Sequence, residues 1–116
     1  MESLEMFCVQ IISNVGLARS NYIEAINKAR EEDFKGAEEC IASGKEKFLK
    51  GHELHLELFK NEENSNMSIS TSVLLMHAED QLMSAEGFKI IAEELIESYG
   101  FCGKSGYTWF RWTGSN

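Results

Sequence analysis

Residues 73–83 read Val-Leu-Leu-Met-His-Ala-Glu-Asp-Gln-Leu-Met, an apolar pattern of helical period with polar interruptions. Two of the interruptions, His77 and Asp80, are three residues apart, so on a helix they lie on the same side. A neutral imidazole offers a basic nitrogen lone pair near physiological pH, which makes His77 a candidate phosphoryl acceptor. Gln81 is also within reach of the ring, and its amide can donate to a phosphoryl oxygen. The alternative is a structural or solvated His–Asp pair.

The helical pattern around this stretch extends from near residues 68–71 to near Tyr99, where Gly100 is the expected C-terminal stop. It contains two apolar stripes. The first has the heptad-like spacing of coiled-coil packing, and it comprises Ile69, Val73, Met76, Asp80, Met83, Gly87 and Ile90. The second lies further around the helix and comprises Leu74, Ala78, Leu82, Ala85, Ala92 and Leu95. Two stripes predict that this helix packs inside its own bundle and against another subunit.

Asp80 occupies a position of the first stripe where an aliphatic residue is expected. A carboxylate buried there must be paired, protonated or bound to a cation. If the helix self-associates about a symmetry axis, several copies of Asp80 converge and require a shared cation such as Mg²⁺, or a proton. The alternative, which periodicity alone favours, places Asp80 at a hydrated edge of the stripe.

Two further helices are predicted before this one. The first runs from about Ser3 to Arg30, with apolar residues at alternating spacings of three and four. The second begins after Asp33, a suitable N-cap, and continues to about Phe59. Its glycines weaken it but allow close approach of a neighbouring helix, and they are Gly36, Gly44 and Gly51. The polar residues 61–66 form the second connection.

These elements predict an all-α fold, a three-helix antiparallel bundle of residues 1–100. The aromatic, glycine-containing residues 101–116 are set apart as a C-terminal tail of unknown order. A chain of 116 residues without proline is expected to form one domain in which nothing interrupts long helices.

The bulk composition argues against several classes of function. The net charge of −8 argues against binding nucleic acid or an anionic membrane surface. Apolar runs such as residues 73–76 are far too short to span a bilayer, and the acidic start of the chain does not resemble a secretory signal. The cysteines Cys8, Cys40 and Cys102 fit neither a zinc cluster nor a disulfide framework, so we expect reduced thiols in the cytoplasm.

The remaining histidines, His52 and His55, are three residues apart on the second predicted helix. Such a pair can chelate a metal, which keeps a cation-binding bundle as an alternative function. Di-iron carboxylate bundles need Glu-x-x-His repeats, and the sequence has none.

Three stretches resemble a known family, the IIA components of lactose/cellobiose-type sugar phosphotransferase systems, from about Met6 to Tyr99. One is Gly-Leu-Ala-Arg-Ser at residues 16–20, followed by the pairs Glu24-Ala25 and Ala29-Arg30. Another begins with Asp33-Phe34 and continues through residues 37–38 to His52. The most specific covers residues 74–83, with Ala-Glu-Glu-Leu-Ile at 92–96 behind it.

The resemblance implies a homotrimer of three-helix subunits with phosphotransferase activity. His77 matches the phosphorylated histidine, which takes a phosphoryl group from the phosphocarrier HPr and passes it to a cysteine of the IIB component. IIB then phosphorylates an entering β-disaccharide of the lactose, cellobiose or chitobiose class. Asp80 matches the aspartate that the family gathers on the trimer axis, where a divalent metal such as Mg²⁺ binds.

Two residues depart from the family pattern. Gln81 replaces a second histidine that many members carry, so an amide must serve in its place. Glu79 replaces the usual glutamine and is expected to add negative charge near the docking face. Both departures keep open the hypothesis of a regulatory or structural helical bundle in which His77 has lost its donor.

Overall fold

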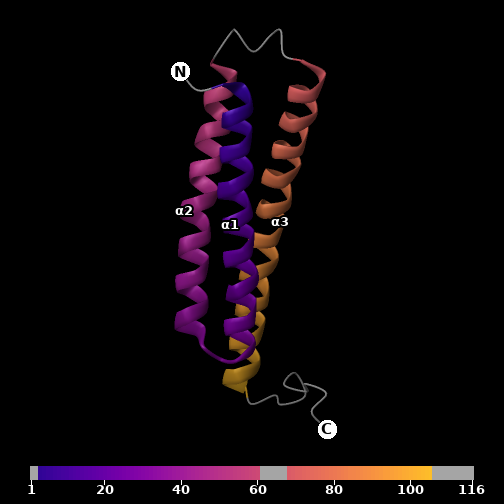
Figure 1. Ribbon diagram of the computed structural model, residues 1–116. Helices are drawn as coiled ribbons and strands as arrows, with labels where there is room; N and C mark the ends of the chain where they lie inside the picture. The colour runs from indigo at the N-terminus through magenta and orange to yellow at the C-terminus, as the bar shows by residue number, and fades with distance from the viewer. Residues whose placement is uncertain (1–2, 61–67, 106–116) are drawn as a thin grey trace.

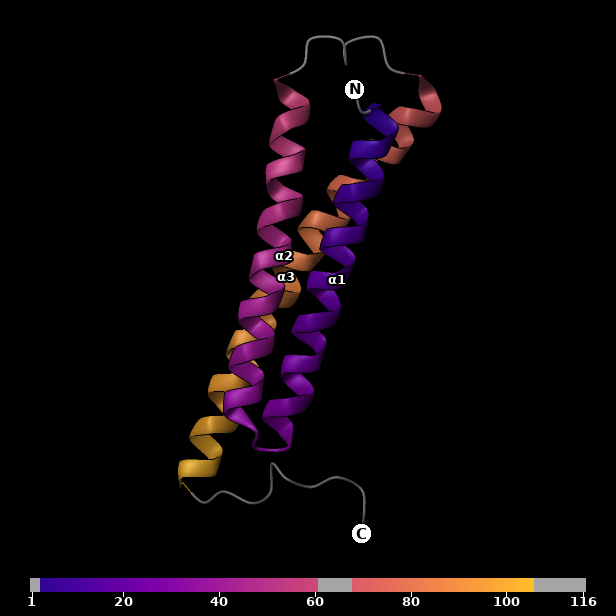
Figure 2. The ribbon, with the colours of Figure 1, turned by 60° about the vertical axis from the view of Figure 1, so that its left-hand side comes forward.

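The computed structural model describes residues 3–60 and 68–105, which form three α-helices and no strand in that part of the chain. They are α1 (Leu4–Arg30), α2 (Phe34–Phe59) and α3 (Ile69–Ser105). The helices lie side by side, with α1 and α3 running in the same direction and α2 in the opposite one (Figure 1 and Figure 2). The principal extents of the molecule are 58 × 24 × 15 Å. The longest of them is close to the roughly 55 Å length of a helix such as α3. The predicted all-α bundle is confirmed.

Capping side chains set the start of α1 and α2. The Ser3 hydroxyl accepts a hydrogen bond from the Met6 backbone N–H at 3.1 Å. Asp33 Oδ1 accepts one from the Gly36 N–H at 3.0 Å, so the predicted N-cap of α2 is confirmed. Each cap satisfies one of the free donors of a first helical turn, which explains why the helices begin there.

The turn between α1 and α2 is short because its backbone N–H groups donate to carbonyl groups in the last turn of α1. Glu32 has a φ of 66°, the left-handed conformation that usually ends a helix. Its N–H donates to the Ala29 carbonyl, and the Asp33 N–H donates to the Lys28 carbonyl, both at 2.9 Å. This pair of bonds is the Schellman arrangement, and it reverses the chain within three residues.

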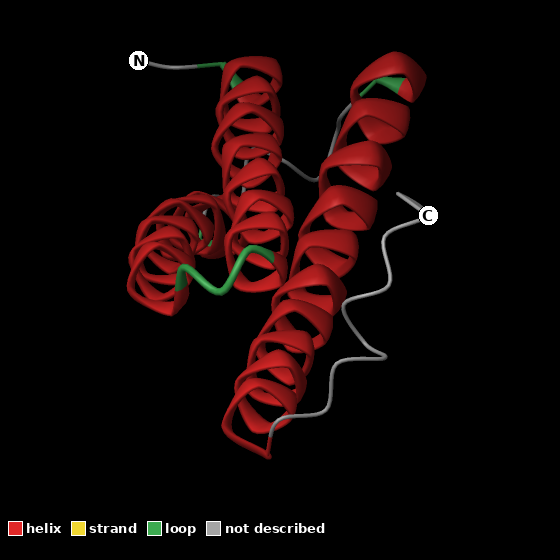
Figure 3. Cartoon of the chain, turned by 90° about the horizontal axis from the view of Figure 1, so that it is seen from below, coloured by secondary structure: helices red, strands yellow, loops and turns green. Residues whose placement is uncertain are grey.

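Helix α1 is the central element of the bundle, and it packs extensively against both α2 and α3. Figure 3 shows α1 between the other two helices. Its fully enclosed side chains repeat at helical spacing along one broad face, and they are Cys8, Ile11, Val15, Ala18, Tyr22, Ala25 and Ala29. Full burial of a large apolar side chain contributes roughly 1.5–3 kcal/mol, so this face is the main source of bundle stability.

Two glycines of α2 allow it to approach α1 closely, as the sequence predicts. A Cβ atom on Gly44 would lie 2.5 Å from Tyr22 Cε1, and one on Gly51 would lie 2.6 Å from Val15 Cγ2. Side chains of α1 therefore occupy the space that any larger residue would need.

Replacing Gly51 by alanine tests this close contact. The added methyl group overlaps Val15, and Gly51→Ala should lower the free energy of unfolding by about 1–2 kcal/mol, despite the higher helix propensity of alanine. Gly16→Ala is the matched control, because nothing lies within 4 Å of a Cβ at that position. Chemical denaturation should show the control unchanged or more stable. Equal stability of the two variants would contradict the close packing.

Helix α3 does not stop at Gly100, contrary to the sequence prediction, and continues to Ser105. Gly100 keeps a helical backbone, and a Cβ there would lie 4.0 Å from Phe34 at the start of α2. The last turns of α3 thus extend beside the first turn of α2, where packing overrides the tendency of glycine to end a helix. The helix carries the first residues of the predicted tail, while residues 106–116 lie outside the described part of the chain.

Tyr22 is completely buried, and its hydroxyl has no hydrogen-bond partner among the described residues. Burial, with a smaller contribution from Glu93, raises the pKa of Tyr22 to about 12. The uncharged phenol is therefore the form that fits the folded bundle.

Tyr22→Phe should leave stability at neutral pH unchanged or higher, because it removes an unpaired buried hydroxyl. The ordinary pKa of Tyr is 10, so the folded state binds the phenolic proton more tightly than the unfolded chain. The contribution of this pKa difference to the free energy of unfolding is fully present below pH 10 and is lost as the pH rises through about 12. Thermal melts of both proteins should diverge over this range, with the variant less sensitive to alkali. A constant difference in melting temperature would refute this assignment.

Candidate functional site

His77 lies in the third turn of α3, and its side chain is exposed. Asp80 is exposed one turn later, and Gln81 is half-buried beside it. None of the three makes a hydrogen bond or an ion pair with another described residue. The structural His77–Asp80 pair, given above as the alternative, is thus not formed in the single chain, and the imidazole is available to an incoming partner.

The first apolar stripe of α3 is an exposed face. Its side chains are 53–85% exposed in the single chain, and they are Ile69, Val73, Met76, Met83 and Ile90. We call these five residues the outer stripe. Large exposed apolar patches are uncommon on monomeric proteins and are typical of interaction surfaces.

The second stripe of α3 faces the bundle core, as the sequence predicts. Its enclosed members pack in the two apolar clusters with α1, and they are Ala78, Leu82, Ala85 and Ala92. The use of this stripe inside the subunit leaves the outer stripe without a neighbour from α1 or α2.

Asp80 lies at the level of the outer stripe, and in the single chain it is not in a buried seam. The hydrated-edge alternative therefore describes one isolated subunit. No group of three or more His, Cys, Asp or Glu side chains in residues 3–60 and 68–105 converges at a possible metal site. One subunit contributes a single carboxylate at Asp80, so a cation there would need ligands from more than one copy of the chain.

Glu79 points toward α2, away from the flank of α3 that carries His77. Its Oε2 lies 2.9 Å from His55 Nε2, and the two side chains are 39% and 18% exposed. The effect of Glu79 on the charge of the docking face stays a prediction, and the structure adds that its carboxylate contacts His55 on α2. Sequence analysis missed this pair because the register of α2 against α3 cannot be read from helical period alone.

The two histidines of α2 have different partners. The His52 ring is exposed and stacks on Phe48, with the ring centroids 6.5 Å apart and nearly parallel planes. The His55 ring meets Glu79 instead. The structure thus gives no observation in favour of a shared metal on these two rings.

Cys8 and Cys40 are free thiols, as expected for two of the three cysteines. Burial raises the pKa of the Cys8 thiol, with smaller contributions from Glu79 and Glu5. Burial also raises the pKa of Cys40. Both thiols are therefore held in the protonated, weakly nucleophilic form.

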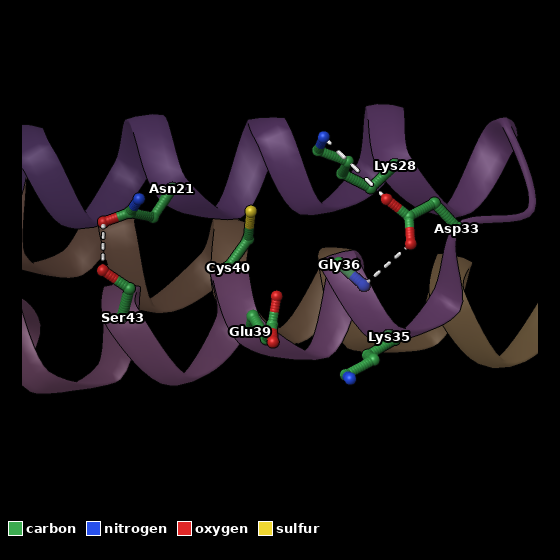
Figure 4. Close-up of a pocket in the computed structure, with 8 residues that line it drawn as sticks. All are labelled: Asn21, Lys28, Asp33, Lys35, Gly36, Glu39, Cys40 and Ser43. Carbon is green, nitrogen blue, oxygen red and sulfur yellow. Dashed lines mark hydrogen bonds and ion pairs between the residues drawn. The ribbon is translucent and has the colours of Figure 1, made fainter.

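An open hollow of about 500 Å³ lies between α1 and α2 near their connecting turn (Figure 4). Its lining carries both signs of charge, and it comprises Asn21, Lys28, Asp33, Lys35, Gly36, Glu39, Cys40 and Ser43. Lys28 Nζ lies 3.9 Å from Asp33 Oδ2 at the edge of the hollow. The hollow is at the end of the bundle opposite the start of α3, so it is separate from the His77 face.

Fold and site together define a small helical bundle whose third helix carries an exposed histidine beside an unpartnered apolar face. Residues 6–100 match the family described as "PTS system, Lactose/Cellobiose specific IIA subunit". The chain belongs to this family, and the resemblance read from the motifs is confirmed.

Characterised relatives and a crystal structure agree with this assignment. The lichenan-specific phosphotransferase enzyme IIA component of Bacillus subtilis is 36% identical over 84% of this chain and 88% of its own length. The lactose-specific EIIA component of Streptococcus mutans is 32% identical, covering 84% and 93%. The cellobiose-specific enzyme IIA from Bacillus anthracis superposes with a TM-score of 0.78 at 32% identity, covering 90% and 94%.

The protein is therefore a component of a sugar phosphotransferase system, with a role in sugar phosphotransfer. None of the helices in the described part of the chain is long and apolar enough to cross a membrane.

Proposed function

We propose that the chain is a phosphohistidine carrier and that His77 is the residue phosphorylated. The observation that carries the proposal is the exposed, uncommitted imidazole of His77 within the family's most specific motif. The other two rings contact Phe48 and Glu79, respectively. A phosphoryl acceptor must offer a ring nitrogen to a second protein, and His77 meets that requirement without rearrangement of the bundle.

The donor in this proposal is the phosphohistidine of HPr. The lone pair of a His77 ring nitrogen forms a new P–N bond, while the old P–N bond breaks and its electron pair returns to the ring of HPr. The same exchange then moves the phosphoryl group to a cysteine thiolate of IIB, where a P–S bond forms. Such transfers depend on positioning and electrostatic stabilisation more than on covalent chemistry by the protein.

Gln81 is assigned a supporting role in the same step. It follows His77 by four residues, so its side chain lies one turn along on the same flank of α3. Its amide N–H groups can donate to phosphoryl oxygens, and an amide remains uncharged at all pH values of interest. Gln81 would thereby hold the phosphoryl group in place of the histidine found in many relatives.

The proposed working form is a homotrimer in which the outer stripe packs around a common axis. Support comes from the heptad-like spacing and strong exposure of this stripe. In that assembly three copies of Asp80 would converge, and together they would supply oxygen ligands for a divalent cation such as Mg²⁺. The cation would balance the mutual repulsion of the carboxylates on the axis, while the apolar contacts of the outer stripe hold the subunits together, and it would take no part in phosphoryl transfer.

The transported sugar is proposed to be a β-disaccharide of the lactose, cellobiose or chitobiose class. The relatives are named for lichenan, lactose and cellobiose at similar identity to this chain. In this proposal the choice among these sugars belongs to the membrane component of the system. The partners HPr and IIB place the proposed reaction in the cytoplasm.

Replacing His77 tests the carrier assignment. His77→Gln should accept no phosphoryl group from phosphorylated HPr, as measured by intact-mass spectrometry at neutral to basic pH. Helical content should remain unchanged, because the side chain is exposed and makes no hydrogen bond or ion pair with the described residues. His52→Gln is the matched control, an exposed histidine of the same chain, and it should be phosphorylated normally. An adduct retained in His77→Gln would refute the assignment, and an unreactive wild-type protein would favour a regulatory or structural bundle.

Replacing Asp80 tests the axial arrangement. Asp80→Leu should preserve or strengthen the trimer, because it exchanges three repelling carboxylates for apolar contacts. Sedimentation equilibrium of both proteins, with and without a chelator, measures the effect. The wild-type trimer should weaken after chelation and the variant should not. Monomers of Asp80→Leu would contradict this account and make the cation essential for assembly.

A further inference from the structure

We propose that Arg19 binds the phosphoryl group carried by His77. In the unmodified protein its guanidinium rests on Ser84, and after phosphorylation it moves along the α1–α3 flank to the phosphoryl oxygens. This inference rests on the proposed function and adds to it a cation that the family motif did not assign to any role.

Arg19 is held weakly in its present position. Its Nη1 donates to Ser84 Oγ at 3.5 Å, which is the long limit of a hydrogen bond. This is the one polar contact that the structure gives Arg19 among the described residues. Guanidinium groups prefer two short, charge-assisted bonds to an oxyanion, so a nearby phosphoryl group would compete successfully with Ser84.

Ser84 and His77 lie on the same flank of α3. The spacing from His77 to Gln81 and Ser84 is four and seven residues, which keeps all three side chains near one line along the helix. Seven residues correspond to a rise of roughly 10.5 Å. Arg19 is therefore already on the flank of the candidate phosphoryl acceptor, two turns away from it.

The register of α1 against α3 shows which residue lies between Arg19 and the level of His77. Thr71 donates to Glu5, and Arg19 donates to Ser84, at sequence offsets of 66 and 65 residues. The same offset places His77 level with residues 11–12 of α1. Gly16 lies between that level and Arg19, on the face of α1 that Arg19 shares.

The path along this flank is open. No heavy atom outside the neighbouring backbone lies within 4 Å of a Cβ built on Gly16. Since a glycine without close neighbours leaves room for a long side chain, the Arg19 guanidinium can extend past Gly16 toward His77.

The charge of the chain favours a cation near the phosphoryl group. The chain has a net charge of −8, so an anionic phosphoryl group is disfavoured unless a cation is near it. The other described basic side chains of α1, Lys28 and Arg30, lie at the far end of that helix. Lys89 is twelve residues beyond His77 on a different face of α3. Arg19 is thus the basic group of these two helices, within the described side chains, that lies nearest to His77.

Two matched variants separate this role from simple helix packing. Arg19→Gln removes the charge, whereas Ser84→Ala removes the present Arg19–Ser84 contact and leaves the charge in place. Both should fold, since Arg19 and Ser84 are only half-buried. Phosphorylation of each protein by phosphorylated HPr is followed by time-resolved intact-mass spectrometry. The ³¹P chemical shift of the phosphohistidine is recorded in parallel.

Arg19→Gln should slow transfer to His77 by about tenfold, the effect of losing one charge-assisted hydrogen bond, and should change the ³¹P shift. Arg19→Lys should recover part of the rate, because it restores the charge without the bidentate geometry. Ser84→Ala should stay within about twofold of wild type. Equal slowing in Arg19→Gln and Ser84→Ala, or a normal rate in Arg19→Gln, would overturn the inference. An unreactive wild-type protein would instead refute the proposed function itself.

Discussion

The close contact between α1 and the glycines of α2 is the constraint on which the rest of the structure depends. Tyr22 and Val15 of α1 occupy the positions that Cβ atoms of Gly44 and Gly51 would take. This contact fixes α2 on one side of α1 and leaves the other side for α3. As a result α3 buries only its second stripe in the subunit core, and the outer stripe faces away from the bundle.

The geometry of α3 then gives four consecutive residues four different environments. Each residue turns the helix by about 100°, so Ala78 is buried in the core while Glu79 reaches His55 on α2. Asp80 lies beside the outer stripe, and His77 is exposed on the flank shared with α1. Phosphoryl acceptance, subunit assembly and internal anchoring are thus proposed for separate sides of a single helical turn. A change on one side need not disturb the others.

Much of this arrangement could be predicted from the sequence. The apolar spacing of α1, the Asp33 cap and the close approach at Gly44 and Gly51 are local signals that proved correct, whereas a Cβ on Gly36 would meet its own N-cap residue, Asp33. The histidine motif identified the family before the fold was known. Helix period could not show that α3 continues through Gly100, because the contact with Phe34 joins residues far apart in the chain.

The side-chain contacts near the site that the sequence did not predict have a common physical origin. The Glu79–His55 pair depends on the register of two helices, and the Arg19–Ser84 contact depends on the register of another two. Periodicity assigns a residue to a face of its own helix but not to a height on the neighbouring one. It also cannot distinguish a stripe buried in a core from one buried by a second copy. Periodicity alone favours a hydrated edge for Asp80, and Asp80 is exposed in the single chain, whereas its place in an assembly stays a prediction.

The most direct test of the central claim is NMR of the imidazole nitrogens in ¹⁵N-histidine-labelled protein, before and after phosphorylation by HPr. The chain has three histidines, so each ring can be followed separately. The account predicts a large shift of one His77 ring nitrogen, with the resonances of His52 and His55 nearly unchanged. Phosphorylation of His52 or His55, or a His77 ring that never changes, would contradict it.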